Sequence, residues 1–247
     1  GYETYLFGGK DGSGAYMQDT WRLIPGLNTF GGDLDYMWDR LTQTGTPPAA
    51  RWDHYAVAAT SQSSYLIVFG GIAKDPENPS QDVVMNDVWR LAPALPDPIW
   101  KKVTILSSSE SPGARCGHAA LWRKSTSADL AQEVFGRMLV FGGRDSPTGS
   151  PTDSALWRLN FTVTGDSATW EKLSATGPSP RFHHALAHDA PSLPDTAFVF
   201  GGEKSGGQKL NDLWRLNVNT LTWTSVGFLA GTPPSPRSRH TATVGGG

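Results

Sequence analysis

The sequence predicts an all-β fold in which antiparallel sheets of similar build stack side by side around a common axis. Three observations predict it: a glycine pair follows a short apolar run at four places, Trp-Arg-Leu follows each pair after 12 to 18 residues, and an Arg-x-x-His motif recurs four times. The composition agrees, because 28 glycines, 18 prolines and ten tryptophans in 247 residues favour turns and aromatic cores over long helices.

Each repeat presents the same parts in the same order along the chain. The apolar runs end at Gly8-Gly9, Gly70-Gly71, Gly142-Gly143 and Gly201-Gly202. Trp-Arg-Leu then begins at Trp21, Trp89, Trp157 and Trp214, and a second tryptophan follows at Trp38, Trp100, Trp170 and Trp223. Last comes Arg-x-x-His, with Arg51 and His54, Arg115 and His118, Arg181 and His184, and Arg237 and His240. Four copies of one order predict four similar structural units.

One unit is predicted to be a sheet of four antiparallel strands, A to D. Arg-x-x-His opens strand A, the apolar run before Gly-Gly is strand B, Trp-Arg-Leu lies on strand C, and the second tryptophan lies on strand D. Consecutive apolar residues from Leu66 to Phe69 indicate a strand that is covered on both faces. The period of two places Trp89 and Leu91 on one face of strand C. Stacking such sheets around an axis covers both faces of each, which is the propeller arrangement.

The combined order resembles the kelch repeat from about Tyr5 to Val244. The Asn-Asp-x-Trp pattern is complete at Asn86 to Trp89 and at Asn211 to Trp214, whereas the first and third units depart from it. The resemblance implies an all-β, kelch-type β-propeller built from four-stranded antiparallel blades. A single propeller region, 1–247, is expected, with blade equivalents at about 1–46, 47–110, 111–177 and 178–232 and a further strand A within 233–247.

The frame of the repeat leaves two arrangements open. The segment from Arg237 to Val244 completes the first unit and closes a ring of four, or it opens a further unit of a larger ring. We expect the larger ring, because kelch-type propellers usually have more than four blades.

The resemblance also implies a site, because strand A is innermost in kelch propellers and its start lines the mouth of the central channel together with the loops after Gly-Gly. The implied ligand- or partner-binding residues are Arg51, Arg115, Arg181, Arg237, Lys10, Arg144 and Lys204. Guanidinium groups suit carboxylates or phosphates, since each donates two parallel hydrogen bonds. The other interpretation is that the repeated arginines serve packing within the blades. The strand C arginines are predicted to be structural and to pair with acidic or carbonyl groups between blades: Arg22, Arg90, Arg158 and Arg215.

No metal or cofactor site is predicted. His184 and His188 lie roughly 13 Å apart on an extended strand at about 3.3 Å per residue, and His183 points to the opposite face, so we expect a core histidine rather than a zinc ligand set with Asp189. The copper and iron signatures of enzymes with this fold are not assembled, and Cys116 is the only thiol. That single cysteine gives no internal disulfide and favours a reducing compartment such as the cytoplasm.

The leading functional hypothesis is a non-enzymatic scaffold module that binds a protein partner, or a larger assembly, through its loop face. The net charge of −2 favours neither nucleic acid nor an acidic membrane surface as a partner. Membrane insertion is not expected, because no apolar run approaches the roughly 18 residues that span a bilayer. Two long inserts, Ile72 to Met85 and Trp122 to Gly136, favour recognition by loops, with Trp52 and Trp122 as candidate anchors. The alternative is an enzyme or carbohydrate binder that uses the central channel, similar to sialate mutarotases or galactose oxidases.

Overall fold

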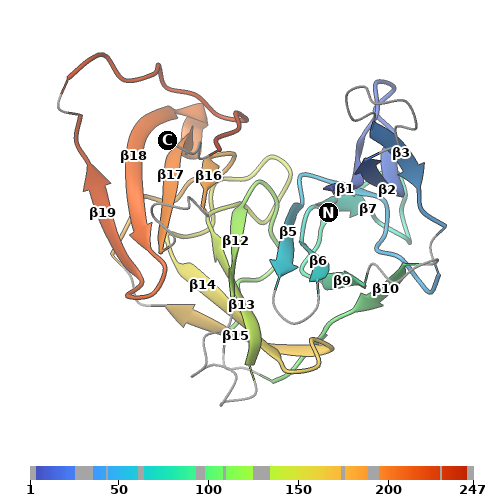
Figure 1. Cartoon of the computed structure of the whole chain (residues 1–247). Helices are drawn as coiled ribbons and strands as arrows, with labels where there is room; N and C mark the ends of the chain where they lie inside the picture. The colour runs from blue at the N-terminus through green and yellow to red at the C-terminus, as the bar shows by residue number, and fades with distance from the viewer. Residues whose placement is uncertain are drawn as a thin grey trace, which may run out of the picture.

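The protein is an all-β arc of four main sheets (Figure 1). The computed structural model describes residues 4–25, 36–42, 44–60, 64–92, 98–107, 110–124, 134–173, 176–188, 195–228 and 230–243. Within these ranges there is no α-helix, only a 3-10 turn at Ser205–Gly207, and no helix is long and apolar enough to cross a membrane.

The four main sheets follow one another along the chain. The first contains β1 (Thr4–Lys10), β2 (Tyr16–Pro25) and β3 (Tyr36–Arg40). The second contains β5 (Tyr55–Thr60), β6 (Ser64–Phe69), β9 (Val88–Ala92) and β10 (Ile99–Lys102). The third contains β12 (Ala119–Lys124), β13 (Val134–Phe141), β14 (Leu156–Thr162) and β15 (Ser167–Leu173), with β11 (Thr104–Ile105) added in parallel to β15. The fourth contains β16 (Ala185–Ala187), β17 (Thr196–Glu203), β18 (Lys209–Asn217) and β19 (Thr222–Val226).

These sheets confirm the predicted strand order. The second, third and fourth sheets each present strands A, B, C and D as antiparallel neighbours, and the first sheet presents B, C and D. The A strands β5, β12 and β16 contact one another in sequence along the inner side of the arc. A small sheet of β4 (Arg51–Trp52), β7 (Ile72–Lys74) and β8 (Asp82–Val84) was not predicted, and it forms within the second unit where the long insert after Gly71 folds back on Arg-x-x-His.

An aromatic pair holds each sheet against the next. The phenylalanine before Gly-Gly packs on the strand D tryptophan of the following unit, with ring centroids 4.9 Å apart for Phe7 and Trp100, 5.1 Å for Phe69 and Trp170, and 5.2 Å for Phe141 and Trp223. These three tryptophans are buried, whereas Trp38 in the first sheet is 50% exposed. The repeated tryptophans therefore build the interfaces between sheets, and the first sheet presents its tryptophan to solvent.

The arc is open between its first and fourth sheets (Figure 1). The described part of the last segment lies against the fourth sheet, where Gly202 N donates to Arg237 O at 2.9 Å and Arg237 N donates to Leu210 O at 2.9 Å. Within the ranges given above, β1 pairs only with β2. Four units therefore do not close the ring here, and the further unit of a larger ring stays a prediction.

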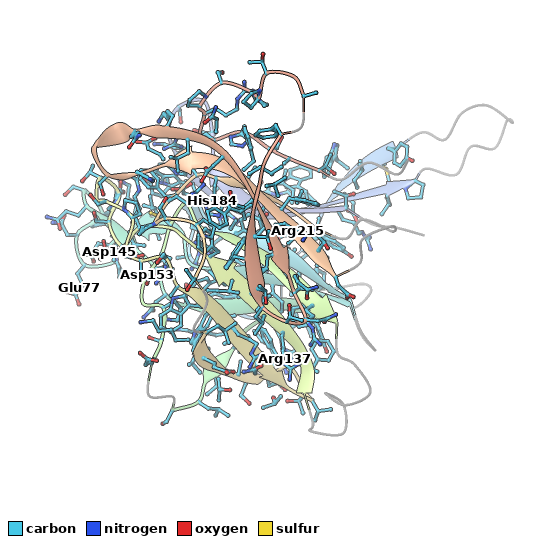
Figure 2. The ribbon with its side chains drawn as sticks, turned by 90° about the vertical axis from the view of Figure 1, so that its left-hand side faces the viewer. Glu77, Arg137, Asp145, Asp153, His184 and Arg215 are labelled. Atoms are coloured by element: carbon cyan, nitrogen blue, oxygen red, sulfur yellow. The ribbon has the colours of Figure 1, made fainter. Side chains whose placement is uncertain are left out.

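Three of the strand C arginines form ion pairs among the described residues, and one of these pairs joins two sheets. Arg90 forms an ion pair with Asp166 of the third sheet. Arg22 pairs with Asp39 and Arg158 with Glu171, each at 2.7 Å and each between directly opposed residues of the same sheet. The prediction of pairing between blades was wrong for these two, because strand D supplies a carboxylate opposite the arginine. Arg215 is exposed on the fourth sheet (Figure 2).

Candidate binding site at the channel mouth

Arg51, the first residue of its Arg-x-x-His motif, is buried and bonds to residues of its own unit. Arg51 has no exposed side-chain surface, and its Nη1 donates to Gly70 O at 3.0 Å and to Asp87 Oδ1 at 2.6 Å, while Nη2 donates to Asp87 Oδ2 at 2.9 Å. Burial acts to raise the pKa of Asp87, but the hydrogen bonds and charge of Arg51 hold it below its ordinary value. The Arg51–Asp87 ion pair, with the bond to Gly70, thus connects the start of strand A to the end of strand B and the start of strand C.

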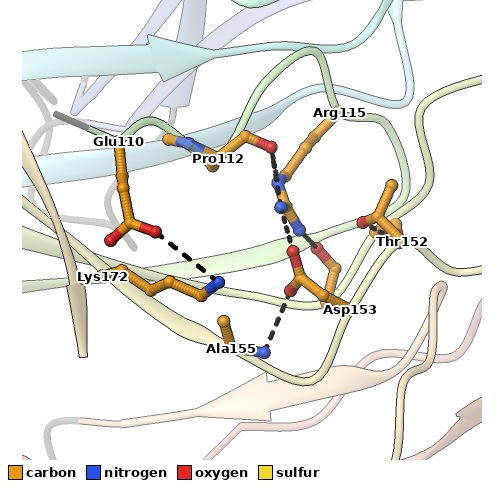
Figure 3. A network of polar contacts seen from close by, with 9 residues as sticks. Glu110, Pro112, Arg115, Thr152, Asp153, Ala155 and Lys172 are labelled. Atoms are coloured by element: carbon orange, nitrogen blue, oxygen red, sulfur yellow. Dashed lines mark hydrogen bonds and ion pairs between the residues drawn. The ribbon is translucent and has the colours of Figure 1, made fainter. Parts of the chain in front are cut away.

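The same arrangement recurs in the third and fourth sheets. Arg181 donates to Gly201 O at 2.9 Å and to both carboxylate oxygens of Asp212 at 2.7 Å. Arg115 lies between the Pro112 carbonyl and Asp153, and its Nη2 donates to them at 2.7 Å each (Figure 3). These contacts support the packing interpretation for three of the four arginines. Arg237, in contrast, is exposed, and its guanidinium group bonds only to Ser235 among the described residues.

The backbone of the same arginines connects each sheet to the one before it. Gly71 N donates to Arg115 O at 2.8 Å, and Gly143 N donates to Arg181 O at 2.9 Å. Gly71 has φ +94°, and a Cβ there would lie 2.7 Å from the Cβ of His54. A side chain at this position is therefore excluded by both strain and space, which explains the Gly-Gly pair.

The fourth residue of the motif is a histidine that packs on a phenylalanine ring of the preceding unit. His54 packs against Phe7, His118 against Phe69 and His184 against Phe141, with ring centroids 5.5, 5.0 and 5.3 Å apart. Burial, with the neighbouring arginine, lowers the pKa of His54 to about 4 and those of His118 and His184 to about 3. His184 is 6% exposed and is thus a core residue, as predicted; Figure 2 labels its position.

No metal centre is found in the part of the chain that the structure describes. Within it, no three His, Cys, Asp or Glu residues gather closely enough to hold an ion. Asp189, which the metal interpretation of the sequence required, lies outside the described residues.

These histidines give an expected pH dependence of stability. Their folded pKa values lie below the ordinary 6.5, so the unfolded chain binds more protons as the pH falls below 6.5, and stability is lost on acidification. Between pH 7 and 5 each histidine is expected to lower the free energy of unfolding by about 2 kcal/mol. The carboxylates whose pKa is lowered reduce the stability only as the pH falls below about 5. Denaturant unfolding across this range measures the slope, and His118→Asn is expected to reduce it by about a third. An unchanged slope would show that His118 is not held neutral.

The third residue of the motif lies at the centre of the loop face. Asp53, Gly117, His183 and Arg239 occupy this position, and all four have left-handed backbones, with φ of 56°, 64°, 51° and 59°. Backbone hydrogen bonds connect them in order around the axis: Gly117 N to Asp53 O at 3.1 Å, His183 N to Gly117 O at 2.7 Å, and Arg239 N to His183 O at 2.9 Å. The residues at this position therefore lie next to one another, in the order of the sheets.

Two of these side chains meet across the glycine. His183 Nε2 lies 3.0 Å from Asp53 Oδ2, and a Cβ on Gly117 would lie only 2.8 Å from the His183 ring. Burial acts to raise the pKa of Asp53, but His183 and the charges of Arg239 and Arg144 lower it, so Asp53 is a carboxylate at neutral pH. The Asp53–His183 pair and Arg239 line a hollow of ≈ 230 Å³.

The predicted loop cations differ in how far a partner can reach them. Lys10 is exposed, with Nζ 4.8 Å from the ring centroid of Trp52 and 5.5 Å from that of Tyr16. Arg144 is only 8% exposed, because its guanidinium packs at 4.5 Å over the Phe182 ring. Lys204 is half-buried. Lys10 thus lies beside Trp52, and Arg144 N donates to Cys116 O at 3.0 Å, so both contact the second residue of an Arg-x-x-His motif. Glu77 and Asp145 lie on the same side of the molecule in Figure 2.

The sequence led us to predict a binding role for the first position of the motif and not for the third. A signal was present, because the first and fourth positions are the same in every copy, whereas the third is Asp, Gly, His or Arg. Gly, Asp and His also tolerate left-handed backbones better than other residues. The prediction that Trp122 is an exposed anchor for a partner was wrong, since its side chain is 7% exposed and packs against Phe135 and Phe161. Trp52 is half-buried beside the mouth.

A comparison with protein families identifies the repeat. The model described as the KLHDC2/KLHL20/DRC7 Kelch-repeats domain matches residues 127–247, and the remaining units have the same strand order. The chain belongs to the kelch-repeat β-propeller family. A similar fold is found in the solved structure of YjhT. It superimposes on this chain with a TM-score of 0.60 at 17% identity, and the match covers 94% of this chain and 64% of that chain.

Curated relatives are longer proteins that contain a similar region. The leucine-zipper-like transcriptional regulator 1 homolog of Drosophila melanogaster is 30% identical over 247 residues, which is 96% of this chain and 21% of that protein. The Rab9 effector protein with kelch motifs of Xenopus laevis is 32% identical over 140 residues, which is 57% of this chain and 34% of that protein. This kelch chain thus spans between about a fifth and a third of the length of these relatives.

Proposed function

We propose that this chain is a protein-interaction module whose partner binds the loop face at the channel mouth. The third residues of the motif carry this proposal. Asp53, His183 and Arg239 adopt left-handed backbones, which cost roughly 1 to 2 kcal/mol each for residues other than glycine. Gly117 fills the equivalent place without that cost. Retaining three charged or polar side chains in strained positions around a hollow is typical of a recognition site.

The chemistry around the mouth favours binding over catalysis. Burial raises the pKa of the Cys116 thiol to about 11, so it is not a nucleophile at neutral pH. The motif histidines are neutral and packed on phenylalanine rings, which leaves them unsuited to exchange protons with a substrate. One kelch relative is described as an effector of Rab9, which agrees with a role in protein interaction.

Affinity capture with a matched pair of variants tests the proposal. The mouth variant combines Asp53→Asn, His183→Asn and Arg239→Asn, since asparagine tolerates the left-handed backbone. The control is Lys172→Asn, an exposed lysine of β15 outside the mouth. Proteins captured from native lysate by the wild type and by the control are expected to be lost with the mouth variant. Capture that is unchanged by the mouth variant contradicts the proposal.

The same preparations test the channel alternative. Thermal unfolding is followed while sugars and metal ions are added one at a time. Stabilisation by one small ligand, lost in the mouth variant and accompanied by no captured protein, would favour the carbohydrate binder or enzyme over the interaction module.

A further inference from the structure

A hollow of ≈ 460 Å³ lies between the second and third sheets. Its lining comes from the start of β9, from the end of β10 with the chain that follows it, and from the segment 111–113 with Trp170 of β15. Both sheets have all four of their strands, A to D. The residues that line the mouth, Asp53, His183 and Arg239, are not part of it. The hollow is therefore separate from the candidate site described above.

The buried residues that line this hollow are mostly apolar. Val88, Val103 and Trp170 are 0%, 3% and 5% exposed. Ile105 also lines the hollow and is 37% exposed, and the adjacent Leu106 is 42% exposed. Apolar surface that remains in contact with water favours the binding of a group that covers it. The lining thus suits an apolar body.

The polar side chains that line the hollow leave their hydrogen-bonding groups to solvent. The side chains of four exposed residues make no hydrogen bond within the described part of the chain: Asn86, Lys102, Thr104 and Ser111. Lys102 forms no ion pair there either, whereas its neighbour Lys101 pairs with Asp166 at 3.6 Å. All four can donate a hydrogen bond, and the ammonium group of Lys102 can only donate. This set suits a hydrogen-bond acceptor.

The charges around the hollow favour an anion. Asp87 contributes a carboxylate, but Arg51 donates to both of its oxygens, and Trp89 Nε1 donates to Oδ2 at 2.6 Å. Arg51 therefore neutralises Asp87, and the charge of Lys102 is left over. An ammonium group beside apolar surface forms its strongest hydrogen bonds with an ionised acceptor such as a carboxylate.

We propose that this hollow binds a small organic acid whose carboxylate is joined to an aromatic body. The ring lies against Val88, Val103 and Trp170, and the carboxylate accepts hydrogen bonds from Lys102. The volume of ≈ 460 Å³ is within the roughly 300 to 1,000 Å³ of small-ligand sites, which combine an apolar lining with a few polar groups. The proposal does not depend on the partner site at the mouth.

Two probes of the same shape test the proposal, 3-phenylpropionate and its uncharged analogue 3-phenylpropanamide. Each is titrated into the wild-type chain to about 10 mM, and binding is followed by NMR at the Trp170 indole and the Val88 and Val103 amides. The acid is expected to saturate these shifts with a dissociation constant about fivefold lower than that of the amide. Lys102→Gln is expected to remove this difference.

Matched variants on the same two strands locate the site. Lys101→Gln changes an exposed lysine that pairs with Asp166, and it is expected to leave the affinity for the acid within twofold. Thr104→Phe is expected to fill the hollow and abolish binding, whereas Thr104→Val, of similar shape, retains it. The variant that combines Asp53→Asn, His183→Asn and Arg239→Asn is expected to bind the acid as the wild type does.

Three outcomes would overturn the proposal. The first is the absence of saturable shifts at these residues with the acid. The second is equal affinity of the wild type for the acid and the amide. The third is tighter binding of a peptide that contains an internal Phe-Asp pair than of the acid, which would make a segment of a partner protein the ligand instead.

Discussion

Trp157→Ala is expected to lower the free energy of unfolding by about 3 to 5 kcal/mol, the usual cost of removing a large buried aromatic side chain. Trp157 is 4% exposed and belongs to the core that joins the second and third sheets with Phe69, Leu159 and Trp170. Its loss leaves a cavity in an interface on which both sheets depend. Denaturant unfolding followed by fluorescence measures the change, and the melting temperature is expected to fall by about 10 °C.

Trp38→Ala is the control, because it deletes a tryptophan side chain that is 50% exposed. It is expected to lower the free energy of unfolding by less than about 1 kcal/mol. A fall of only a degree or two for Trp157→Ala would contradict the account of stacked sheets.

Arg51→Ala is expected to cost about 3 to 5 kcal/mol, because it removes one partner of a buried ion pair. The substitution leaves the Asp87 carboxylate, 8% exposed, and the Gly70 carbonyl without their principal donor. Arg51→Lys is expected to recover only part of this loss, since an ammonium group cannot donate to both carboxylate oxygens in the same planar geometry. Denaturant unfolding at pH 7 measures all three proteins.

Arg237→Ala provides the comparison for Arg51→Ala. It carries the same substitution at the same place in the motif, but its guanidinium is exposed and bonds only to Ser235 among the described residues. It is expected to change the free energy of unfolding by less than about 0.5 kcal/mol. Equal losses at positions 51 and 237 would show that the buried pair with Asp87 is not the source of the stability.

The repeated features of the fold could be predicted because each has one physical solution. Gly71 needs a left-handed backbone and has no room for a side chain, so its place in the sequence marks the end of strand B. Trp157 and Leu159 share one face of strand C and Arg158 lies on the other, and this period of two follows from strand geometry.

The candidate site could be predicted only in part. A repeated arginine is compatible with both a ligand and a packing role, and the partner that decides between them, Asp87 for Arg51, lies 36 residues away in sequence. The left-handed backbone of His183 depends on contacts with neighbouring sheets rather than on its own residue type. For the same reason the small sheet at Ile72–Lys74 could not be foreseen, because its register depends on the position of Arg51 in the folded ring.

In each Arg-x-x-His motif the first and fourth residues hold the sheets together, whereas the third is proposed to contact the partner. One motif tests this division most directly, through the melting temperature and partner capture of Arg181→Ala and His183→Asn. The account predicts that His183→Asn keeps the melting temperature within about 3 °C and loses the captured partner, whereas Arg181→Ala lowers the melting temperature by about 10 °C. Retention of the partner by His183→Asn, or a loss of stability as large as that of Arg181→Ala, would contradict it.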